Sequence, residues 1–364
     1  ALNIHNAGQM SADHAIGIKA INIQQHGEVE SAREISIKAA NIQHTGEISG
    51  TAVTIDGGLG NEGTVRASEM LSIICAHPVH HKGIFETPQL YLTGGRFLNE
   101  STIDVGLFST RNAHFSNKGK IGVRRWRTVL ESLVNEGSIR IKELSKNPLE
   151  RSIQEFTNRG HVKFETSAFL TGIVFMNEGD VRSDQDLTLV VSRLEQARTL
   201  YALGSLSVVA DDILFSQKSL CLGGGKLLLK AVQGLEINGG VKSRAHVALL
   251  SGGDITNSGT VVSPTATTLF MRGVLENRGK MHLSNGVIVA PGGIINKGNM
   301  ILEWVDIKSA APVSLSNTES LIIKGPAVRG DTVLVLDGDA PTKSAEMLKG
   351  SSVHLPPADL LTGA

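Results

Sequence analysis

The sequence predicts an all-β fold, a parallel β-helix (β-solenoid) of about 16 rungs, from three observations. A motif of Asn or His, any residue and Gly returns about every 19 residues. Apolar residues hold fixed places after each Gly, and pairs such as Ile35 and Ile37 stand two residues apart. That spacing is the strand period, because alternate side chains of a strand share one face. A unit this thin cannot bury its apolar face alone, so successive units must stack.

Each rung is predicted to hold three short strands. The first carries an apolar residue two places after the Gly, as Val29 does after Gly27. The second carries the apolar pair, and the third carries an apolar residue four places before the next Gly, as at Ile42. No segment follows the 3.6-residue period of a helix.

Tight corners are predicted to join the strands. The Gly of the motif would supply a positive φ at little steric cost. The Asn two places earlier would stack on its counterparts in neighbouring rungs as a hydrogen-bonded amide ladder. We assign these residues a structural role, as at Asn61, Gly63, Asn257, Gly259, Asn277 and Gly279.

The repeat predicts a solenoid shaft over residues 1–324, followed by a divergent last rung, cap or linker over 325–364. Net charge is zero and aromatic residues make up only 4%, which argues against a nucleic-acid-binding surface. No apolar run reaches the ~18 residues that a membrane span needs, so no membrane insertion is expected. Cys75 and Cys221 stand too far apart along the stack to form a disulfide.

Catalytic patterns are weak. Carboxylates that cleave glycosides sit about 5–9.5 Å apart. Asp211 and Asp212 are sequence neighbours expected on opposite faces of a strand, and no acidic pair recurs in consecutive rungs. The sequence therefore predicts a protein that is not an enzyme and needs no cofactor.

One cluster has residue types that bind zinc: Cys75, His77, His80 and His81. Its spacing matches no established zinc motif, and solvent-exposed corner histidines are the alternative interpretation.

Two segments suggest partner contacts. The run Arg124, Arg125, Trp126 and Arg127 combines the residue types that anchor interfaces, and the polar insertion 142–151 follows about one rung later. We expect the two to form one basic, Trp-containing protrusion if their corners share an edge. Arg329, Gly330 and Asp331 spell the integrin-binding tripeptide, a short motif that often arises by chance.

The unit Asn-x-Gly-x-Ile, then Leu-x-Leu, then Leu-x-Asn-x-Gly resembles the shaft repeats of filamentous haemagglutinin-like exoproteins. Local examples are Leu275–Met281 and Ile255–Val261. The resemblance covers residues 1 to about 324. It implies the right-handed winding and a part of a large bacterial protein exported by two-partner secretion, serving as an adhesin, haemolysin or toxin carrier.

The first functional hypothesis is thus a non-catalytic shaft of a secreted or cell-surface adhesin or toxin-delivery exoprotein involved in virulence. Its partners would be a protein or glycan receptor on another cell and neighbouring repeats of a longer parent chain. One alternative is a β-helical polysaccharide-binding or polysaccharide-cleaving protein, which needs carboxylates or aromatics from three adjacent rungs in one groove. Another is an effector scaffold that binds host protein.

Overall fold

A computed structural model describes residues 3–111, 113–147 and 151–309, with the backbone of three later strands, Val313–Ser314, Leu321–Lys324 and Leu334–Val335. The described residues form β-strands and connecting corners and no helix. Neighbouring strands pair in parallel with partners about 19 residues away, so the chain winds as a β-solenoid of about 16 rungs. The predicted β-solenoid is confirmed. The chain divides into two compact units, residues 1–184 and 185–364.

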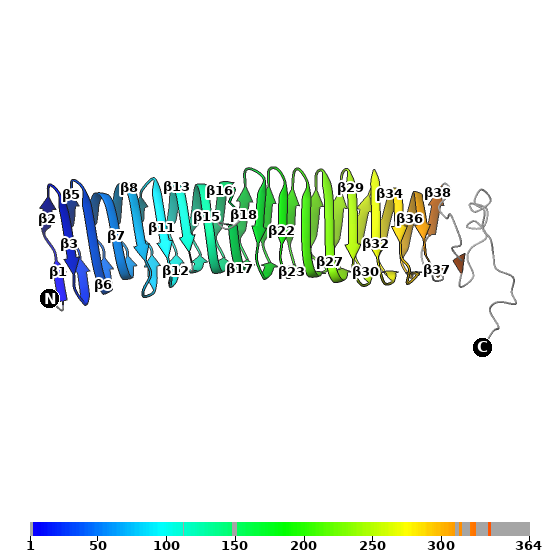
Figure 1. Cartoon of the computed structure of the whole chain (residues 1–364), viewed down its shortest axis with the longest axis horizontal. Helices are drawn as coiled ribbons and strands as arrows, with labels where there is room; N and C mark the ends of the chain where they lie inside the picture. The colour runs from blue at the N-terminus through cyan, green and yellow to red at the C-terminus, as the bar shows by residue number, and fades with distance from the viewer. Residues whose placement is uncertain are drawn as a thin grey trace. The chain divides into compact units, whose positions relative to one another are not determined.

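Each rung of the first unit presents three strand faces that stack on those of the next rung, and several long strands serve two or all three of them (Figure 1). Face 1 ends at the Asn motif, face 2 follows the Gly, and face 3 carries the apolar pair; the first rung shows them as β1, β2 and β3. The strands of this unit are β1 (Asn3–Asn6), β2 (Gln9–Ala12), β3 (Ala15–Lys19), β4 (Asn22–Gln25), β5 (Glu28–Ser31), β6 (Glu34–His44), β7 (Glu47–Asn61), β8 (Thr64–Ile74), β9 (Val79–His81), β10 (Ile84–Glu86), β11 (Gln89–Thr93), β12 (Arg96–Asn99), β13 (Thr102–Arg111), β14 (His114–Asn117), β15 (Lys120–Asn135), β16 (Ser138–Leu144), β17 (Arg151–Asn158), β18 (His161–Phe164), β19 (Ala168–Thr171), β20 (Val174–Asn177) and β21 (Asp180–Ser183).

The second unit repeats the same three faces, and several of its strands bend through a corner and serve two of them. Its strands are β22 (Leu187–Val190), β23 (Arg193–Gln196), β24 (Thr199–Ala202), β25 (Leu206–Phe215), β26 (Leu220–Gly223), β27 (Lys226–Ile237), β28 (Gly240–Ser243), β29 (His246–Ser251), β30 (Ile255–Asn257), β31 (Thr260–Ser263), β32 (Ala266–Met271), β33 (Leu275–Asn277), β34 (Lys280–Val289), β35 (Ile294–Asn296), β36 (Asn299–Lys308), β37 (Val313–Ser314), β38 (Leu321–Lys324) and β39 (Leu334–Val335).

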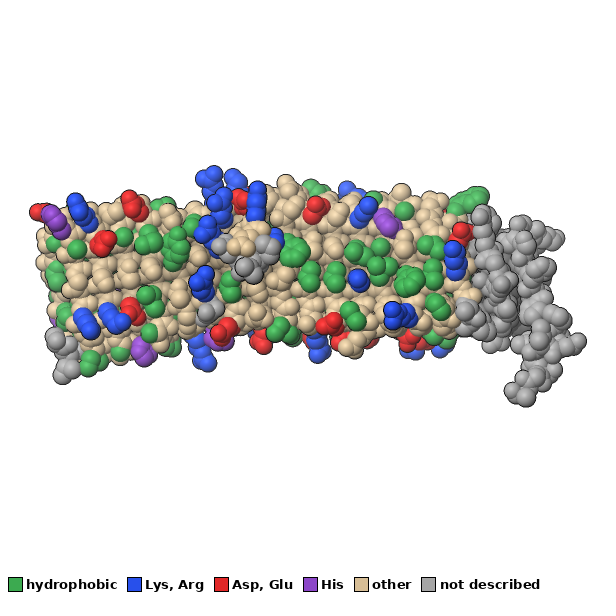
Figure 2. Space-filling model, viewed as in Figure 1, with side chains coloured by type: hydrophobic (Ala, Val, Ile, Leu, Met, Phe, Trp, Pro, Cys, Tyr) green, Lys and Arg blue, Asp and Glu red, His purple; other side chains and the backbone are tan. Residues whose placement is uncertain are grey.

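The core of each unit is a set of inward columns, because strand alternation buries every second side chain. On face 3 of the first unit Leu90 pairs with Phe108, and Phe108 pairs with Trp126. The rings of Phe108 and Trp126 stack with their centroids 5.4 Å apart. Most charged residues lie at outward positions, and in each unit Lys and Arg lie beside Asp and Glu (Figure 2).

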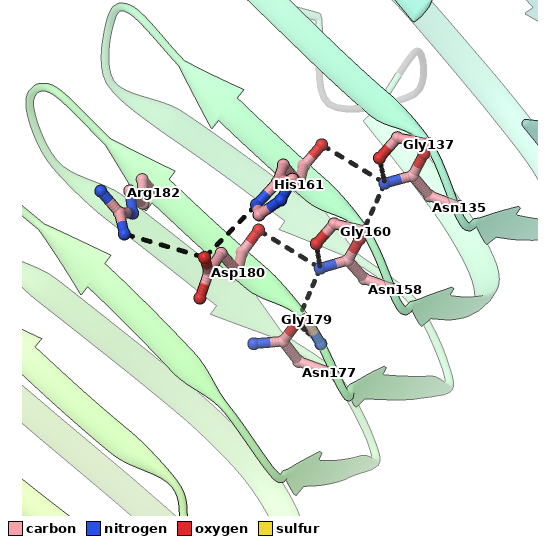
Figure 3. A network of polar contacts seen from close by, with 9 residues as sticks. All are labelled: Asn135, Gly137, Asn158, Gly160, His161, Asn177, Gly179, Asp180 and Arg182. Atoms are coloured by element: carbon pink, nitrogen blue, oxygen red, sulfur yellow. Dashed lines mark hydrogen bonds and ion pairs between the residues drawn. The ribbon is translucent and has the colours of Figure 1, made fainter. Parts of the chain in front are cut away.

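The amide ladder is present in both units, and its side chains point inward. In the first unit Asn99, Asn117, Asn135 and Asn158 each donate from Nδ2 to Oδ1 of the next Asn, over 2.8 Å. The same Nδ2 also reaches the carbonyl of the Gly two places on, as Asn135 does to Gly137 (Figure 3). In the second unit Asn257 donates to Asn277, and Asn277 to Asn296. The predicted ladder is confirmed for these residues.

The reason for the motif Gly is different from the one predicted. Gly63, Gly259 and Gly279 do not have a positive φ. A Cβ on Gly279 would stand 2.1 Å from the carbonyl oxygen of Gly259 in the preceding rung. Glycine is required because stacked corners approach so closely that a side chain has no room.

Candidate functional site

The exposed basic residues predicted to contact a partner lie at one corner of the first unit. Val123 pairs with Ile141 and Arg125 with Glu143, so Arg124 and Lys142 face each other on adjacent rungs. Arg124, Arg125 and Lys142 are exposed, and we call them the basic corner. Figure 2 shows Lys and Arg side chains gathered at one edge over β15 and β16. Arg124 and Lys142 therefore share an edge, which is the condition that the sequence analysis set for one basic protrusion.

The basic corner is only partly neutralised. The Arg125 guanidinium stands 3.6 Å from the Glu143 carboxylate. Neither Arg124 nor Lys142 has an ion-pair partner within the described part of the chain. By contrast, Arg140 pairs with Glu165 and Lys163 with Asp184 on the neighbouring face 2. An excess of positive charge therefore remains at this corner.

Trp126 is not part of that surface, which corrects the prediction of a Trp-containing protrusion. Its side chain is 1% exposed, and its indole Nε1 donates to Thr110 Oγ1 over 3.2 Å. The motif spacing is 18 residues here instead of 19, as between Asn117 and Asn135. This shift moves the inward pair one place earlier, onto Trp126 and Thr128. Arg127, between them, points outward and is half-buried.

Arg329, Gly330 and Asp331 lie outside the described residues, as does most of the segment 325–364. The polar insertion 142–151 begins as strand in β16 and resumes as strand at Arg151.

The predicted zinc cluster is wrong, because its members face different ways. β8 ends at Ile74, and the corner that follows leaves Cys75 buried and His77 exposed. His80 points outward and lies 2.8 Å from Glu100, whereas His81 points inward. Among the described residues no group of three His, Cys, Asp or Glu side chains has the geometry to hold a metal ion.

His81 and His44 instead belong to the inward column of the amide ladder, where the sequence analysis expected exposed histidines. Asn61 Nδ2 donates to Nδ1 of His81 over 3.0 Å, and the His81 ring stacks on Phe85 at 3.7 Å. Burial lowers the pKa of His81 to about 4 and also lowers the pKa of His44. Their position two residues before Gly83 and Gly46 is the signal that identifies them. Both cysteines are free and buried, and burial raises the pKa of Cys75 to about 12.

A groove of about 560 Å³ opens on face 1 of the second unit. It lies where Gly234 provides no side chain, and Asp212, Glu236 and Asp254 line it from three adjacent rungs. Asp211 and Asp212 are both exposed, contrary to the expected opposite faces, because the chain turns a corner after Ala210, where the N–H groups of both aspartates donate to the carbonyl of Ser192. The structure thus brings together carboxylates that the sequence analysis did not align.

A second groove of about 380 Å³ lies on face 1 of the first unit, again over glycines. Gly58 and Gly60 form its floor, and Asn41, Gln43 and His80 are among its polar walls.

An exposed tryptophan was also missed by the sequence analysis. Trp304 is 62% exposed and has a φ of 58°, a left-handed conformation that bulky residues rarely adopt. Asn285, in the equivalent place one rung earlier, has a φ of 45°. In its own rung, each of these residues forms a one-residue bend between faces 2 and 3. The Trp304 side chain points outward from its bend.

Comparison with known proteins gave no match to a family model, a curated protein or a solved structure. Across the described residues, no helix has the length and apolar character to span a bilayer.

Proposed function

We propose that the chain is a non-catalytic shaft segment of a large secreted or surface-displayed bacterial exoprotein, which presents a contact surface to another cell. The observation that carries this proposal is how completely the described residues are used to build the repeat. Nearly all of them build one repeated rung, and the motif residues are used inside it as stacking glycines and ladder amides. A chain organised in this way supplies length and surface rather than an enclosed reaction site.

The basic corner is the contact surface that this proposal favours. Arginine and lysine at an exposed, partly unneutralised corner attract acidic partners and raise the rate of encounter. The partner class is therefore an acidic protein surface or an acidic glycan on the contacted cell. The resemblance of the repeats to filamentous haemagglutinin-like shafts supports the same role.

The test compares two triple variants of the whole chain. In the first, Arg124, Arg125 and Lys142 become Ala; in the matched control, Arg140, Lys163 and Arg182 become Ala. Both remove three cations from neighbouring exposed positions. All three control cations already pair, with Glu165, Asp184 and Asp180, whereas in the first set only Arg125 has such a partner, Glu143. Binding to immobilised sulfated glycan and to intact cells is measured at two salt concentrations.

We expect the first variant to bind at least about tenfold more weakly and the control to bind within about twofold of the unchanged chain. Circular dichroism confirms folding of both. Equal loss in the two variants would assign binding to overall charge, and wild-type binding by the first variant would remove the basic corner from the proposal. Antibody labelling of intact producing cells and of the medium tests export; signal only after lysis argues for the effector-scaffold alternative.

A second candidate function, binding or cleavage of polysaccharide, is favoured by the groove at Gly234. Carboxylates from three adjacent rungs are the feature such a site needs. The test incubates the chain with neutral and acidic polysaccharides and measures reducing ends and retention on the polymer. Release of reducing ends that disappears in Asp212→Asn and in Asp254→Asn would establish this function and contradict the non-catalytic one. If neither cleavage nor retention is observed, the polysaccharide function is excluded.

A further inference from the structure

The outward side of face 3 in the second unit carries an apolar band that the sequence analysis does not single out. Along its first column the strand register aligns six rungs, and the outward residues are, in order, Val190, Val209, Lys230, Leu250, Phe270 and Val289. Val190 is 36% exposed and Phe270 46% exposed. Figure 2 shows hydrophobic side chains gathered over the strands between β22 and β34.

The second outward column of this face, two residues earlier on each strand, carries smaller side chains. The same register aligns, in order, Thr188, Ser207, Leu228, Ala248, Thr268 and Val287. We call the first column, which contains Phe270, the large column, and the second, which contains Ala248, the small column. One rung further on, Asp306 continues the small column and Lys308 continues the large column. We define the apolar band as these two columns.

The first three rungs of the same face in the first unit are polar, so an apolar surface is not a requirement of the fold. Its outward residues include Lys19, Lys38 and Asp56 in one column and Ser36 and Thr54 in the other. Isolated exposed apolar residues need no explanation, whereas a contiguous band of them marks a contact surface.

We propose that the apolar band docks against the same band of a second copy of this chain, with the two copies parallel and in register. A two-fold axis that runs along the stacking direction between the columns would place each small column against the partner's large one. Ala248 would then face Leu250 and Thr268 would face Phe270, so that small side chains meet large ones.

Charge supports the same arrangement. In the parallel, in-register pair Asp306 of each copy faces Lys308 of the other, giving two ion pairs at the end of the band. Lys230 faces Leu228, which the methylene stem of the lysine can cover while its ammonium stays in water. A shift by one rung would place Lys308 against Val287. An antiparallel pair that overlaps the same seven rungs would place Lys308 against Val190 and Asp306 against Thr188, so neither ion pair would form.

The area sets the strength of the contact. Rungs stack about 4.8 Å apart, so the band covers about 30 Å by 15 Å, or about 450 Å² per copy. Stable interfaces bury about 800 Å² per partner, so the pair is a weak, concentration-dependent dimer. Such contacts add up where many copies lie side by side on a surface.

Sedimentation of the whole chain over a range of concentrations tests the proposal. We expect reversible dimerisation that Phe270→Glu weakens at least about tenfold. The matched control is Tyr91→Glu, an outward aromatic residue on face 3 of the first unit, which should leave dimerisation unchanged. A chain that stays monomeric at all concentrations, or equal effects of the two variants, would overturn the proposal.

Two further variants test the orientation. Asp306→Lys and Lys308→Asp should each weaken the dimer, and the double variant with the two charges exchanged should restore it. Ser207→Cys should cross-link to its own counterpart through a short bismaleimide, because the two sites would lie about 12 Å apart. Cys75 and Cys221 are buried and do not compete, and Ser72→Cys on the first unit is the control. Failure of the charge exchange together with absence of this cross-link would refute the parallel, in-register pair.

Discussion

The inward column at the end of face 1 differs between the two units. In the first unit it is polar at every described rung, from Asn6 through His81 to Asn177. In the second unit Gln196 is followed by Phe215 and Ile237 before the amides resume at Asn257. The solenoid continues through both kinds of column, so the fold does not depend on Asn as such.

The corner after Phe215 shows what replaces the amide. Four residues separate Phe215 from Leu220, and Ser219 donates from its N–H and its Oγ to the carbonyl of Ser216. This corner closes with its own hydrogen bonds, whereas an Asn corner uses the amide to bond both the following Gly and the next rung. A polar column persists only where each amide has a polar neighbour, because a buried amide without partners is costly.

The largest expected effect comes from closing the gap between stacked corners. In Gly160→Ala the new Cβ would stand 2.0 Å from the carbonyl oxygen of Gly137, a backbone atom that cannot swing away. We expect a loss of about 4 kcal/mol in the free energy of unfolding, above the usual range for overpacking. Gly8→Ala is the control, since nothing lies within 4 Å of its Cβ position. Equal stability of the two variants in urea titrations would contradict this reading of the motif glycine.

Low pH should destabilise the first unit through the buried histidines in the inward column of face 1. The unfolded chain binds a proton at His81 near pH 6.5, but the folded chain does so only near pH 4. Stability is therefore full above pH 6.5 and falls as the pH drops toward 4, by about 3 kcal/mol in all for this residue. The added proton also removes the Nδ1 acceptor that Asn61 uses.

His81→Asn should remove this residue's share of the fall and keep a polar neighbour for Asn61. His44 retains its own share, because burial lowers its pKa as well. The control is His77→Asn at an exposed corner. Urea midpoints measured between pH 4 and pH 7 check the prediction; a fall in the His81→Asn protein as steep as in the unchanged chain would show that His81 is not the residue responsible.

The sequence predicts the rung, its three strands and the amide ladder because these features repeat and errors at one rung are corrected by the next. It does less well where one rung departs from the average. Trp126 is misplaced because the 18-residue spacing shifts the inward pair by one position. Asp212 and Asp254 enter one groove only because Gly234 leaves a gap and the chain turns a corner after Ala210. The apolar band becomes visible only once register aligns Val190, Leu250 and Phe270 across rungs.

The smallest expected effects compare the two kinds of inward column directly. Asn158→Ala leaves the Nδ2 of Asn135 and the Oδ1 of Asn177 without their ladder partners, and we expect it to cost about 2 kcal/mol. Ile237→Asn places an amide next to Asn257, where its Nδ2 can donate to the Oδ1 of Asn257 and so lengthen the ladder by one rung.

The new amide also loses the apolar contact with Phe215, so we expect Ile237→Asn to cost only about 1 kcal/mol. Phe215→Asn is the matched control, because its rung neighbours are Gln196 and Ile237 and only one of them is polar. It should cost more than Ile237→Asn. Hydrogen exchange of the corner amides, followed rung by rung, measures each loss where it occurs. If Ile237→Asn proves as costly as Asn158→Ala, a polar neighbour is not what sets the cost of an inward amide. The difference between the two columns would then reflect the local shape of each corner.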